Sequence, residues 1–319
     1  MLLPMATKEK GAYGEIKKII TDDYDLLYKF LSFFSFEDSY LNSPTYYLFT
    51  GRRGLWLYHS DGGAVLACQH PNLPDCQLVF PPFGPKPHRT LAQALQSLSI
   101  IRKEIRLARV PVAQVERYRD SLAAYGIKAT PQVEDVMDWK YPVQVLSTER
   151  VLEHSGDGFK NHRCQYNYFI KHNTPTIEDL NRSFDLEGFL EAWAVRNLSG
   201  TYSLEDIKGP YEELLRLYRR NHPLLQGFVV KIGGQIVGFN FYELPLKAGL
   251  PANSFAGICD TTLRGLSDFM QREECRRLHV AGVAEVNIGG SENEGLNYFK
   301  SKFRPIHSLS LVSFNLSEL

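Results

Sequence analysis

The sequence has no net charge and few cysteines. Its 36 Lys and Arg residues balance 36 Asp and Glu residues, so no global field attracts a polyanion, and any nucleic-acid contact must come from local clusters. The 5 cysteines are odd in number and form no paired-cysteine motif, which is typical of a reduced cytoplasmic protein with buried thiols. They are Cys68, Cys76, Cys164, Cys259 and Cys275.

Long apolar runs are missing as well. No stretch of the chain approaches the roughly 18 consecutive apolar residues that a membrane-spanning helix needs. The opening run "MLLPMATKEK" becomes charged too early for a signal peptide. Nothing in the sequence distinguishes a monomer from an oligomer. We therefore expect a soluble, cytoplasmic protein without stable membrane insertion.

The motifs of several other protein classes are absent. His154 and His162 are separated by 8 positions without an acidic partner at ligand spacing, and the other 7 of the 9 histidines are scattered, so no metal site is expected. No Ser or Cys stands in a nucleophile elbow, and the chain has neither a phosphate-binding P-loop nor a dinucleotide fingerprint. No resident cofactor is therefore expected.

The composition that is present is globular and fits two domains. At 319 residues, with 44% hydrophobic and 23% charged residues, the chain is long enough for two large cores. In the first half we predict a helix over 14–36, a helix over 88–109 and another that ends at Gly126. The predicted strands of this half are "TYYLFT", "GLWLYH", "AVLACQ", "CQLVFPPFG" and "VEDVMDWKYPVQV".

In the second half, three helical segments precede a change to strand periodicity. One helix follows Ser147 as its N-cap, one is "GDGFKNHRCQYNYFIKHN", and one spans 204–220. Two strands around Gly233-Gly234 then give a hairpin signal. The strand "SFAGICD", a helix over 263–279, the strand "AEVNIGG", another helix and the strand "IHSLSLVSFNL" complete the chain. This order predicts two mixed α/β domains, 1–142 and 143–319.

A hairpin followed by strand, helix, strand, helix and strand is also the order of acetyltransferase-type (GNAT-like) domains, and two stretches narrow this resemblance. "SGDGFKNHRCQYNYFIKH" resembles the Gly-aromatic-Lys…Arg…Asn helix that opens the catalytic half of the phosphatidylglycerol lysyltransferase C-terminal domain and its soluble stand-alone relatives. "VNIGGSENEGLNYFKSKFRP" resembles the same family's Asn-Leu-Gly…Gly-Leu…Lys ending and the Phe-Lys element of the peptidoglycan-bridge aminoacyl transferases.

The resemblance implies a tandem GNAT-like fold, α/β with mixed sheets, that takes an aminoacyl group from aminoacyl-tRNA. Because the membrane-spanning half of the lysyltransferases is absent here, it favours the amine or hydroxyl of a small molecule or peptide as the acceptor. Two alternatives remain open: an N-acyltransferase that uses acetyl-coenzyme A or another acyl-coenzyme A, and a non-catalytic GNAT-like binding module. The stretch "TTLRGLSDF" weakens the coenzyme A reading, because Gly265 has no second glycine to complete a pyrophosphate cradle.

For acyl transfer, the predicted catalytic centre is Lys300 beside the Gly289-Gly290 corner. Acyl transfer needs a donor where the oxyanion develops, and Lys300 can neutralise that oxyanion or the phosphate of the terminal tRNA nucleotide. Gly289, Gly290 and Ser291 are predicted to bind substrate here, because backbone N–H groups at the corner and the following helix N-terminus also favour anions. The alternative is an ordinary N-cap at Ser291 with acidic residues in the first turn, which needs no ligand.

Four further carboxylate and amide positions complete this predicted centre. Asn287 would hold the carbonyl from the strand end, and Glu292 would orient the donor's amino group or the acceptor amine. Asp260 and Glu243 each end a predicted strand, and either carboxylate could accept the proton of the attacking amine. Carboxylates at strand ends are also often solvated or paired with Arg.

Basic helix positions are the predicted binding residues. Lys160 and Arg163 share one helix face with Asn167 one turn further on, which suits a phosphate or carboxylate. Arg264 precedes Gly265 in the incomplete cradle. For aminoacyl-tRNA, three basic clusters are candidates, and each is also explained as a solvated helix face. They are Arg102, Lys103, Arg106 and Arg109; Arg216, Arg219 and Arg220; and Arg272, Arg276 and Arg277.

Overall fold

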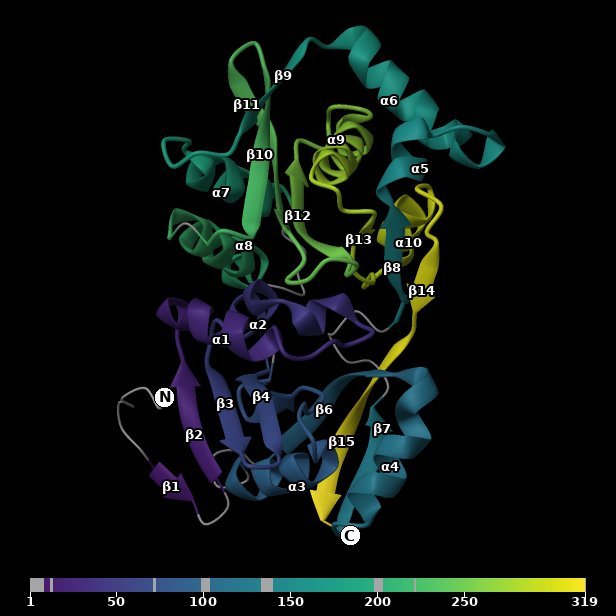
Figure 1. Ribbon diagram of the computed structural model, residues 1–319. Coiled ribbons are helices and arrows are strands. Elements are labelled where there is room, and N and C mark those ends of the chain that lie inside the picture. The colour runs from purple at the N-terminus through teal and green to yellow at the C-terminus, as the bar shows by residue number, and fades with distance from the viewer. Residues whose placement is uncertain are drawn as a thin grey trace. The chain divides into compact units, whose positions relative to one another are not determined.

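The computed structural model divides the chain into two compact units (Figure 1). The first contains residues 1–140 and 310–319, and the second contains residues 141–309. The sequence places the division after residue 142 and keeps the C-terminal segment with the second domain. The structure describes residues 9–11, 14–70, 73–98, 104–132, 140–197, 203–220 and 222–318.

The first unit is built on an eight-stranded sheet in the order β1-β2-β3-β4-β5-β6-β15-β7. Neighbouring strands are antiparallel except β5 and β6, which are parallel. Its strands are β1 (Glu9–Gly11), β2 (Gly14–Ile19), β3 (Leu55–Ser60), β4 (Gly63–Gln69), β5 (Cys76–Val79), β6 (Glu104–Pro111), β7 (Ile127–Gln132) and β15 (Leu311–Glu318). Its helices are α1 (Tyr24–Leu31), α2 (Pro44–Thr50), α3 (Pro87–Leu98) and α4 (Val115–Ala123).

The second unit is built on a seven-stranded sheet in the order β14-β8-β13-β12-β11-β10-β9. Here β12 and β13 form the parallel pair. The strands are β8 (Val143–Ser147), β9 (Pro175–Asp179), β10 (Leu225–Ile232), β11 (Gln235–Glu243), β12 (Ala252–Cys259), β13 (Glu285–Asn287) and β14 (His307–Leu309). The helices are α5 (Thr148–Glu153), α6 (Lys160–His172), α7 (Leu186–Arg196), α8 (Leu204–Arg219), α9 (Leu266–Val280) and α10 (Glu294–Ser301).

The two sheets repeat one strand order. Without β1, the first reads β2-β3-β4-β5-β6-β15-β7, and the second reads β9-β10-β11-β12-β13-β8-β14. In each, two helices follow the first strand, an antiparallel meander comes next, and one helix leads into the parallel strand. The place beside that strand is filled from elsewhere in the chain, by β15 in the first sheet and by β8 in the second. This repeat is the element order expected of two GNAT-like domains.

Several predicted elements differ in the structure. The run "TYYLFT" forms helix α2 instead of a strand, because Ser43 caps it by accepting the Tyr46 N–H (2.9 Å) and Pro44 occupies its first turn. The stretch 88–109 divides into α3 and the buried strand β6, and 14–36 divides into β2 and α1. The final run divides too: β14 lies at the edge of the second sheet, and β15 pairs in the first.

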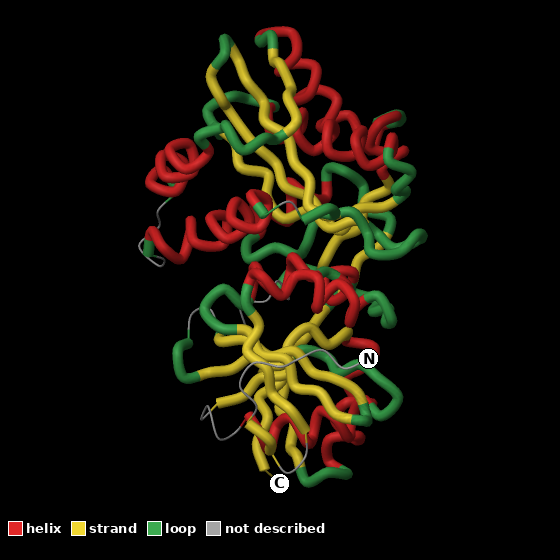
Figure 2. The backbone as a smooth tube through the Cα atoms, turned by 60° about the vertical axis from the view of Figure 1, so that its left-hand side comes forward, coloured by secondary structure: helices red, strands yellow, loops and turns green. Residues whose placement is uncertain are grey.

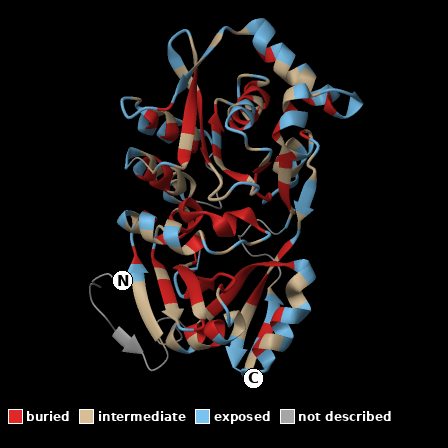
Figure 3. Ribbon diagram, in the orientation of Figure 1, coloured by how far each residue is buried: buried red, intermediate tan, exposed pale blue. Residues whose placement is uncertain are grey.

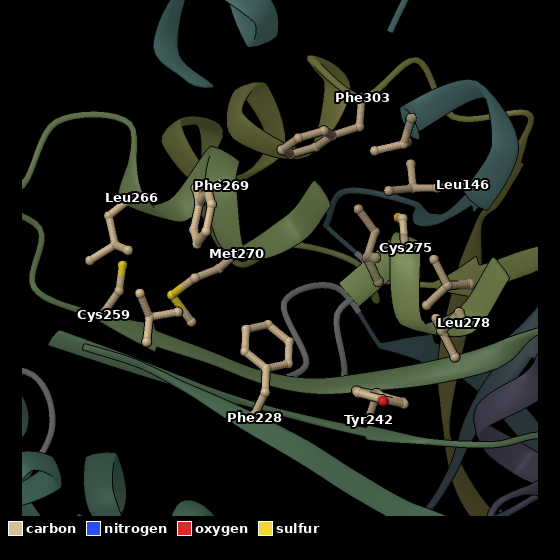
Figure 4. Close-up of a cluster of buried hydrophobic side chains, with 14 of the residues drawn as sticks. Leu146, Phe228, Tyr242, Cys259, Leu266, Phe269, Met270, Cys275, Leu278 and Phe303 are labelled. Atoms are coloured by element: carbon tan, nitrogen blue, oxygen red, sulfur yellow. The ribbon is translucent and has the colours of Figure 1, made fainter. Parts of the chain in front are cut away.

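The second unit has a core on the face of its sheet that α9 covers. Phe228 from β10 and Met270 and Leu278 from α9 are among its buried side chains (Figure 4). On the opposite face, the Phe239 ring meets Phe189 of α7 with centroids 5.9 Å apart. Helices therefore lie on both faces of the sheet (Figure 2), and buried residues concentrate along its strands (Figure 3). Within the described ranges, no helix is long and apolar enough to cross a membrane.

Candidate active site

The Gly289-Gly290 corner lies where β12 and β13 separate. Their parallel pairing ends with Asn253 opposite Asn287, and the chain then turns at Gly289, whose φ of 72° favours glycine. The Gly289 N–H donates to Asn287 Oδ1 (2.8 Å), and the Gly289 carbonyl accepts the Gln144 N–H (3.2 Å). The corner is thus fixed to β8 and to the end of β13.

Lys300 reaches this corner from α10. Its Nζ donates to the carbonyl oxygen of Gly290, and its side chain is half-buried. Asn293 caps α10, because its Oδ1 accepts the Leu296 N–H (2.8 Å). The alternative interpretation of Ser291 as the N-cap is therefore wrong, while Lys300 does contact the Gly289-Gly290 corner, through the Gly290 carbonyl.

Ser291 instead points a hydroxyl into the protein interior. It is fully buried, and its backbone bridges to Tyr141. Among the described residues, neither Ser291 Oγ nor the buried Oε1 of Gln144 has a hydrogen-bond partner. A buried hydroxyl without a partner costs free energy unless a ligand or water satisfies it. Glu292 is exposed beside it.

Glu243, Asn253 and Asn287 form a buried row across three neighbouring strands. Glu243 of β11 is opposite Asn253 of β12, and Asn253 is opposite Asn287 of β13. Their exposed fractions are 1%, 3% and 1%. Tyr242, Ala252 and Val286, one position earlier on each strand, pack in the α9 core, so the row faces away from α9. Sequence reasoning selected Glu243 and Asn287 separately and missed Asn253, which only the strand register reveals.

Asp260 lies away from this row, just beyond the opposite end of β12. Its Oδ1 accepts hydrogen bonds from the Thr262 N–H (3.0 Å) and hydroxyl (2.7 Å), and Arg196 Nη1 lies 3.5 Å away. The Thr262 hydrogen bonds, followed by the Arg196 charge, lower the pKa of the Asp260 carboxyl. A carboxylate held in its charged form is a weak proton acceptor at neutral pH.

The predicted binding residues of α6 have different environments. Arg163 Nη1 donates to the carbonyls of His154 (2.5 Å) and Gly156 (2.6 Å), so this side chain holds the turn between α5 and α6. Lys160 and Asn167 are exposed. Arg264 is exposed too, with Nε donating to Gln165 Oε1 (3.0 Å) of α6. The structure therefore brings Arg264 to α6 and assigns Arg163 a structural contact.

The glycine of the incomplete cradle is packed against α6. Gly265 has φ of 84°, and a Cβ added there would lie 2.1 Å from the backbone oxygen of Gln165. The N–H of Leu266 donates to the Leu263 carbonyl (3.1 Å). The side of Gly265 on which a Cβ would project is thus taken by the α6 backbone.

A buried charged cluster near α10 was not predicted from the sequence. Lys302 Nζ lies 2.9 Å from both carboxylate oxygens of Asp268 on α9, and Asp268 Oδ1 also lies 3.1 Å from Nδ1 of the buried His162. The spacing between positions 162, 268 and 302 gave no signal, because three separate elements bring these residues together.

Comparisons with known proteins show the fold. No protein-family model and no curated protein matches the sequence. A conserved protein of unknown function from Bacteroides thetaiotaomicron has a similar structure, with a TM-score of 0.75 and 15% identity over 95% of this chain and 99% of the other. The C-terminal domain of a candidate lysylphosphatidylglycerol synthetase from Agrobacterium fabrum matches with a TM-score of 0.64 and 14% identity over 92% and 91% of the two chains.

A tandem GNAT protein from the clavulanic acid biosynthesis pathway also matches, with a TM-score of 0.54 and 10% identity over 96% of this chain and 98% of the other. The chain therefore folds as two tandem GNAT-like domains. The structural likeness to a lysylphosphatidylglycerol synthetase domain agrees with the resemblance drawn from the two sequence motifs.

Proposed function

We propose that this protein is an aminoacyltransferase that moves an aminoacyl group from aminoacyl-tRNA to an amine or hydroxyl of a small molecule or peptide. The observation that carries the proposal is the contact of Lys300 Nζ with the Gly290 carbonyl beside the buried, unpartnered Ser291 hydroxyl. The two sequence motifs and the fold likeness to the lysylphosphatidylglycerol synthetase domain support it. The amino acid and the acceptor are left open by this proposal.

The reaction exchanges one acyl bond for another. The acceptor nitrogen or oxygen attacks the ester carbonyl that joins the aminoacyl group to the terminal ribose of the tRNA. The new amide or ester bond forms as the ribose ester bond breaks, the acceptor proton passes to a base, and the tRNA leaves with a free hydroxyl. Charge builds on the carbonyl oxygen in the transition state, so a nearby cation accelerates the step.

The described residues fit these roles unequally. Lys300 is the group we assign to the developing oxyanion, because it already lies at the corner and can exchange the Gly290 carbonyl for a ligand oxygen. Glu243 is favoured over Asp260 as the base, since it is buried in the row with Asn253 and Asn287 while Asp260 is bound by Thr262. We assign Glu292, which is exposed beside the corner, to the amino group of donor or acceptor.

The likeness to a tandem GNAT protein keeps an acyl-coenzyme A donor as the second candidate. Two features argue against it: Gly265 has no second glycine to complete a pyrophosphate cradle, and the α6 backbone at Gln165 packs against this glycine. Calorimetry with acetyl-coenzyme A separates the two: we expect no binding at micromolar concentrations, and micromolar affinity would promote the coenzyme A candidate.

The direct test uses a mixture of radiolabelled aminoacyl-tRNAs with a pool of small amines, amino acids and short peptides. We expect the wild-type chain to release label from one or a few tRNA species faster than spontaneous hydrolysis, and the label to appear in a new amide or ester. If every tRNA loses its label only at the rate of spontaneous hydrolysis, the result would support the non-catalytic binding module instead.

A further inference from the structure

Helix α6 carries basic residues and no acidic ones. Its thirteen residues, Lys160–His172, include no Asp or Glu, although the whole chain has 36 acidic residues. His162 and Phe169 are its buried side. Its exposed side is mainly basic, amide-bearing and aromatic, and consists of Lys160, Asn161, Cys164, Asn167, Tyr168, Ile170, Lys171 and His172.

A stacked set of side chains lies on this exposed side. The His172 ring stacks on Tyr168 with centroids 4.2 Å apart and an interplanar angle of 26°. The Arg264 guanidinium carbon lies 4.4 Å from the centroid of the Tyr168 ring and is fixed by Gln165. Tyr168 remains 37% exposed. Exposed aromatic rings with an adjacent guanidinium are the groups on which unpaired bases of single-stranded RNA stack.

The exposed side of α6 continues onto α10, the helix that carries Lys300. Asn161 Nδ2 donates to the Tyr298 hydroxyl (3.1 Å), and Tyr298 is 62% exposed. Two residues later on α10, Lys300 contacts the Gly290 carbonyl. Both helices belong to the second unit, so this surface and the candidate active site lie on one compact unit.

Most arginines of the other basic clusters that the structure describes are paired with carboxylates, whereas Arg272 donates to the Leu152 carbonyl; Arg102 and Lys103 lie outside the described residues. Arg219 Nη1 lies 2.6 Å from Glu187, Arg276 Nε lies 2.7 Å from Glu273, and Arg277 Nη1 lies 2.5 Å from Asp179. Lys160 and Lys171, by contrast, have no carboxylate within salt-bridge distance in the part of the chain that the structure describes, so their charges remain available to an anion. The binding free energy of a polyanion is most favourable when the cations it contacts do not first have to break an ion pair within the protein.

We propose that the exposed side of α6, together with Arg264 and Tyr298, binds the single-stranded acceptor end of the donor tRNA. This inference rests on the proposed function. The lysines contact backbone phosphates, the Tyr168–His172 stack supports a base, and Tyr298 directs the strand towards the Gly289-Gly290 corner. Phosphate contacts by Lys make the affinity salt-dependent, whereas stacking on Tyr168 does not.

Binding is measured by fluorescence anisotropy with uncharged bulk tRNA and with an RNA microhelix that ends in a single-stranded 3′ segment. The variants are Lys160→Ala/Lys171→Ala and Tyr168→Ala, and the matched control is Arg216→Ala/Arg219→Ala on α8, whose arginines are paired with Glu213 and Glu187. We expect the lysine variant to lose roughly tenfold in affinity and to reduce the slope of log affinity against log salt by between about 1 and 2. Tyr168→Ala should lose roughly fivefold or more with the slope unchanged.

The inference is overturned if the α6 variants bind RNA as wild type does, or if the α8 control loses as much. It is also overturned if the lysine variant loses binding to anionic phospholipid vesicles while its RNA affinity is kept, which would make α6 a membrane-surface contact. The transfer assay on the same variants separates the two proposals. If the wild-type protein transfers the aminoacyl group and the variants bind RNA unchanged, only the role of α6 is contradicted. If the protein binds RNA tightly but transfers nothing, only the proposed activity is contradicted.

Discussion

Arg109 of the first unit and Gly289 of the second hold the same place in the repeated fold. Each lies two residues beyond the last residue that pairs with the parallel neighbouring strand, Leu107 or Asn287. Each has a positive φ, 61° for the arginine and 72° for the glycine. The backbone turn is therefore a feature of the fold, and the side chain at that turn differs between the units.

That difference favours the second unit as the site of chemistry. The Arg109 side chain is buried, its Nε lies 2.6 Å from the buried Asp38, and its guanidinium carbon lies 5.3 Å and 5.1 Å from the ring centroids of Tyr40 and Tyr46. In the first unit this place is filled by the protein's own ion pair and rings. In the second unit Gly289 contributes only backbone, with Lys300 close by.

Replacing Gly265 with alanine should destabilise the second unit far more than the same change at Gly249. Both glycines have φ of 84°, so both variants incur the left-handed backbone cost of about 1 kcal/mol. At Gly249 nothing lies within 4 Å of the added Cβ, while at Gly265 it meets the Gln165 backbone oxygen at 2.1 Å. We expect Gly265→Ala to lose about 2 kcal/mol more than Gly249→Ala in urea unfolding. Equal losses would show that α6 can move away from this glycine without cost.

Glu274 should make stability fall as pH rises. Burial raises the pKa of this carboxyl from 4.5 to about 7, even though Asn240 and Gln271 donate hydrogen bonds to it. The unfolded chain ionises at the lower pKa, so between pH 4.5 and 7 the folded state holds more protons and loses stability as pH increases. The full effect is about 3 kcal/mol.

Glu274→Gln keeps a neutral, hydrogen-bonding side chain and removes this titration. In urea unfolding at pH 5 and pH 8, we expect wild type to lose more stability over this interval than the variant does. The free energy of unfolding of the variant should exceed that of wild type at pH 8. Parallel pH profiles for the two proteins would contradict the raised pKa.

The sequence predicted elements best where periodicity was unambiguous. The hairpin at Gly233-Gly234, the N-cap at Ser147 and the order of elements from that hairpin to α10 follow from local pattern, and the structure has all three. The strand β9 and the helix α7, which lie between α6 and α8, were not predicted. The strand β6 was missed because its alternate positions are buried on both faces, Arg106 and Arg109 included, so helical spacing fitted equally well. The place of β15 in the first sheet depends on pairing with β6 and β7, whose residues lie between 181 and 211 positions earlier in the chain, and no local signal encodes this pairing.

In the candidate site, too, the sequence predicts the contacts within one short segment and not those between separate elements. Lys300 and the two glycines lie within one short stretch, so their proximity followed from a strand, a turn and a helix. The row of Glu243, Asn253 and Asn287 depends on register across three strands. The contact of Lys302 with Asp268 depends on how α9 and the end of α10 pack, and a sequence of alternating basic residues gives the same pattern whether a lysine is buried or solvated.

Lys302→Met should cost stability. Lys302 and Asp268 side chains are 11% and 3% exposed, so removing the ammonium leaves a buried carboxylate whose remaining partner is His162. We expect the free energy of unfolding to fall by about 3 kcal/mol. The double variant Lys302→Met/Asp268→Asn should recover part of this loss, since it leaves no unpaired charge. Urea unfolding checks both, and a single variant as stable as wild type would show that Asp268 gains water when the lysine is removed.

Lys300→Ala tests the proposed chemistry itself. If Lys300 neutralises charge that develops on the carbonyl oxygen, the substitution removes an interaction made mainly in the transition state, and turnover should fall by roughly 100-fold or more. Loss of the hydrogen bond to the Gly290 carbonyl should lower the free energy of unfolding by about 1 kcal/mol.

The control for this last measurement has to be a lysine outside the site. Lys302 cannot serve, because its removal takes an ion-pair partner away from the buried Asp268 carboxylate. The matched change is therefore Lys128→Ala on the exposed side of β7. Transfer from radiolabelled aminoacyl-tRNA is compared for both variants at equal folded concentration. A large loss in Lys300→Ala with wild-type rates in Lys128→Ala supports the assignment. Equally small losses in both would mean that Lys300 only fastens α10 to the Gly289-Gly290 corner, and that the corner is a turn without a ligand.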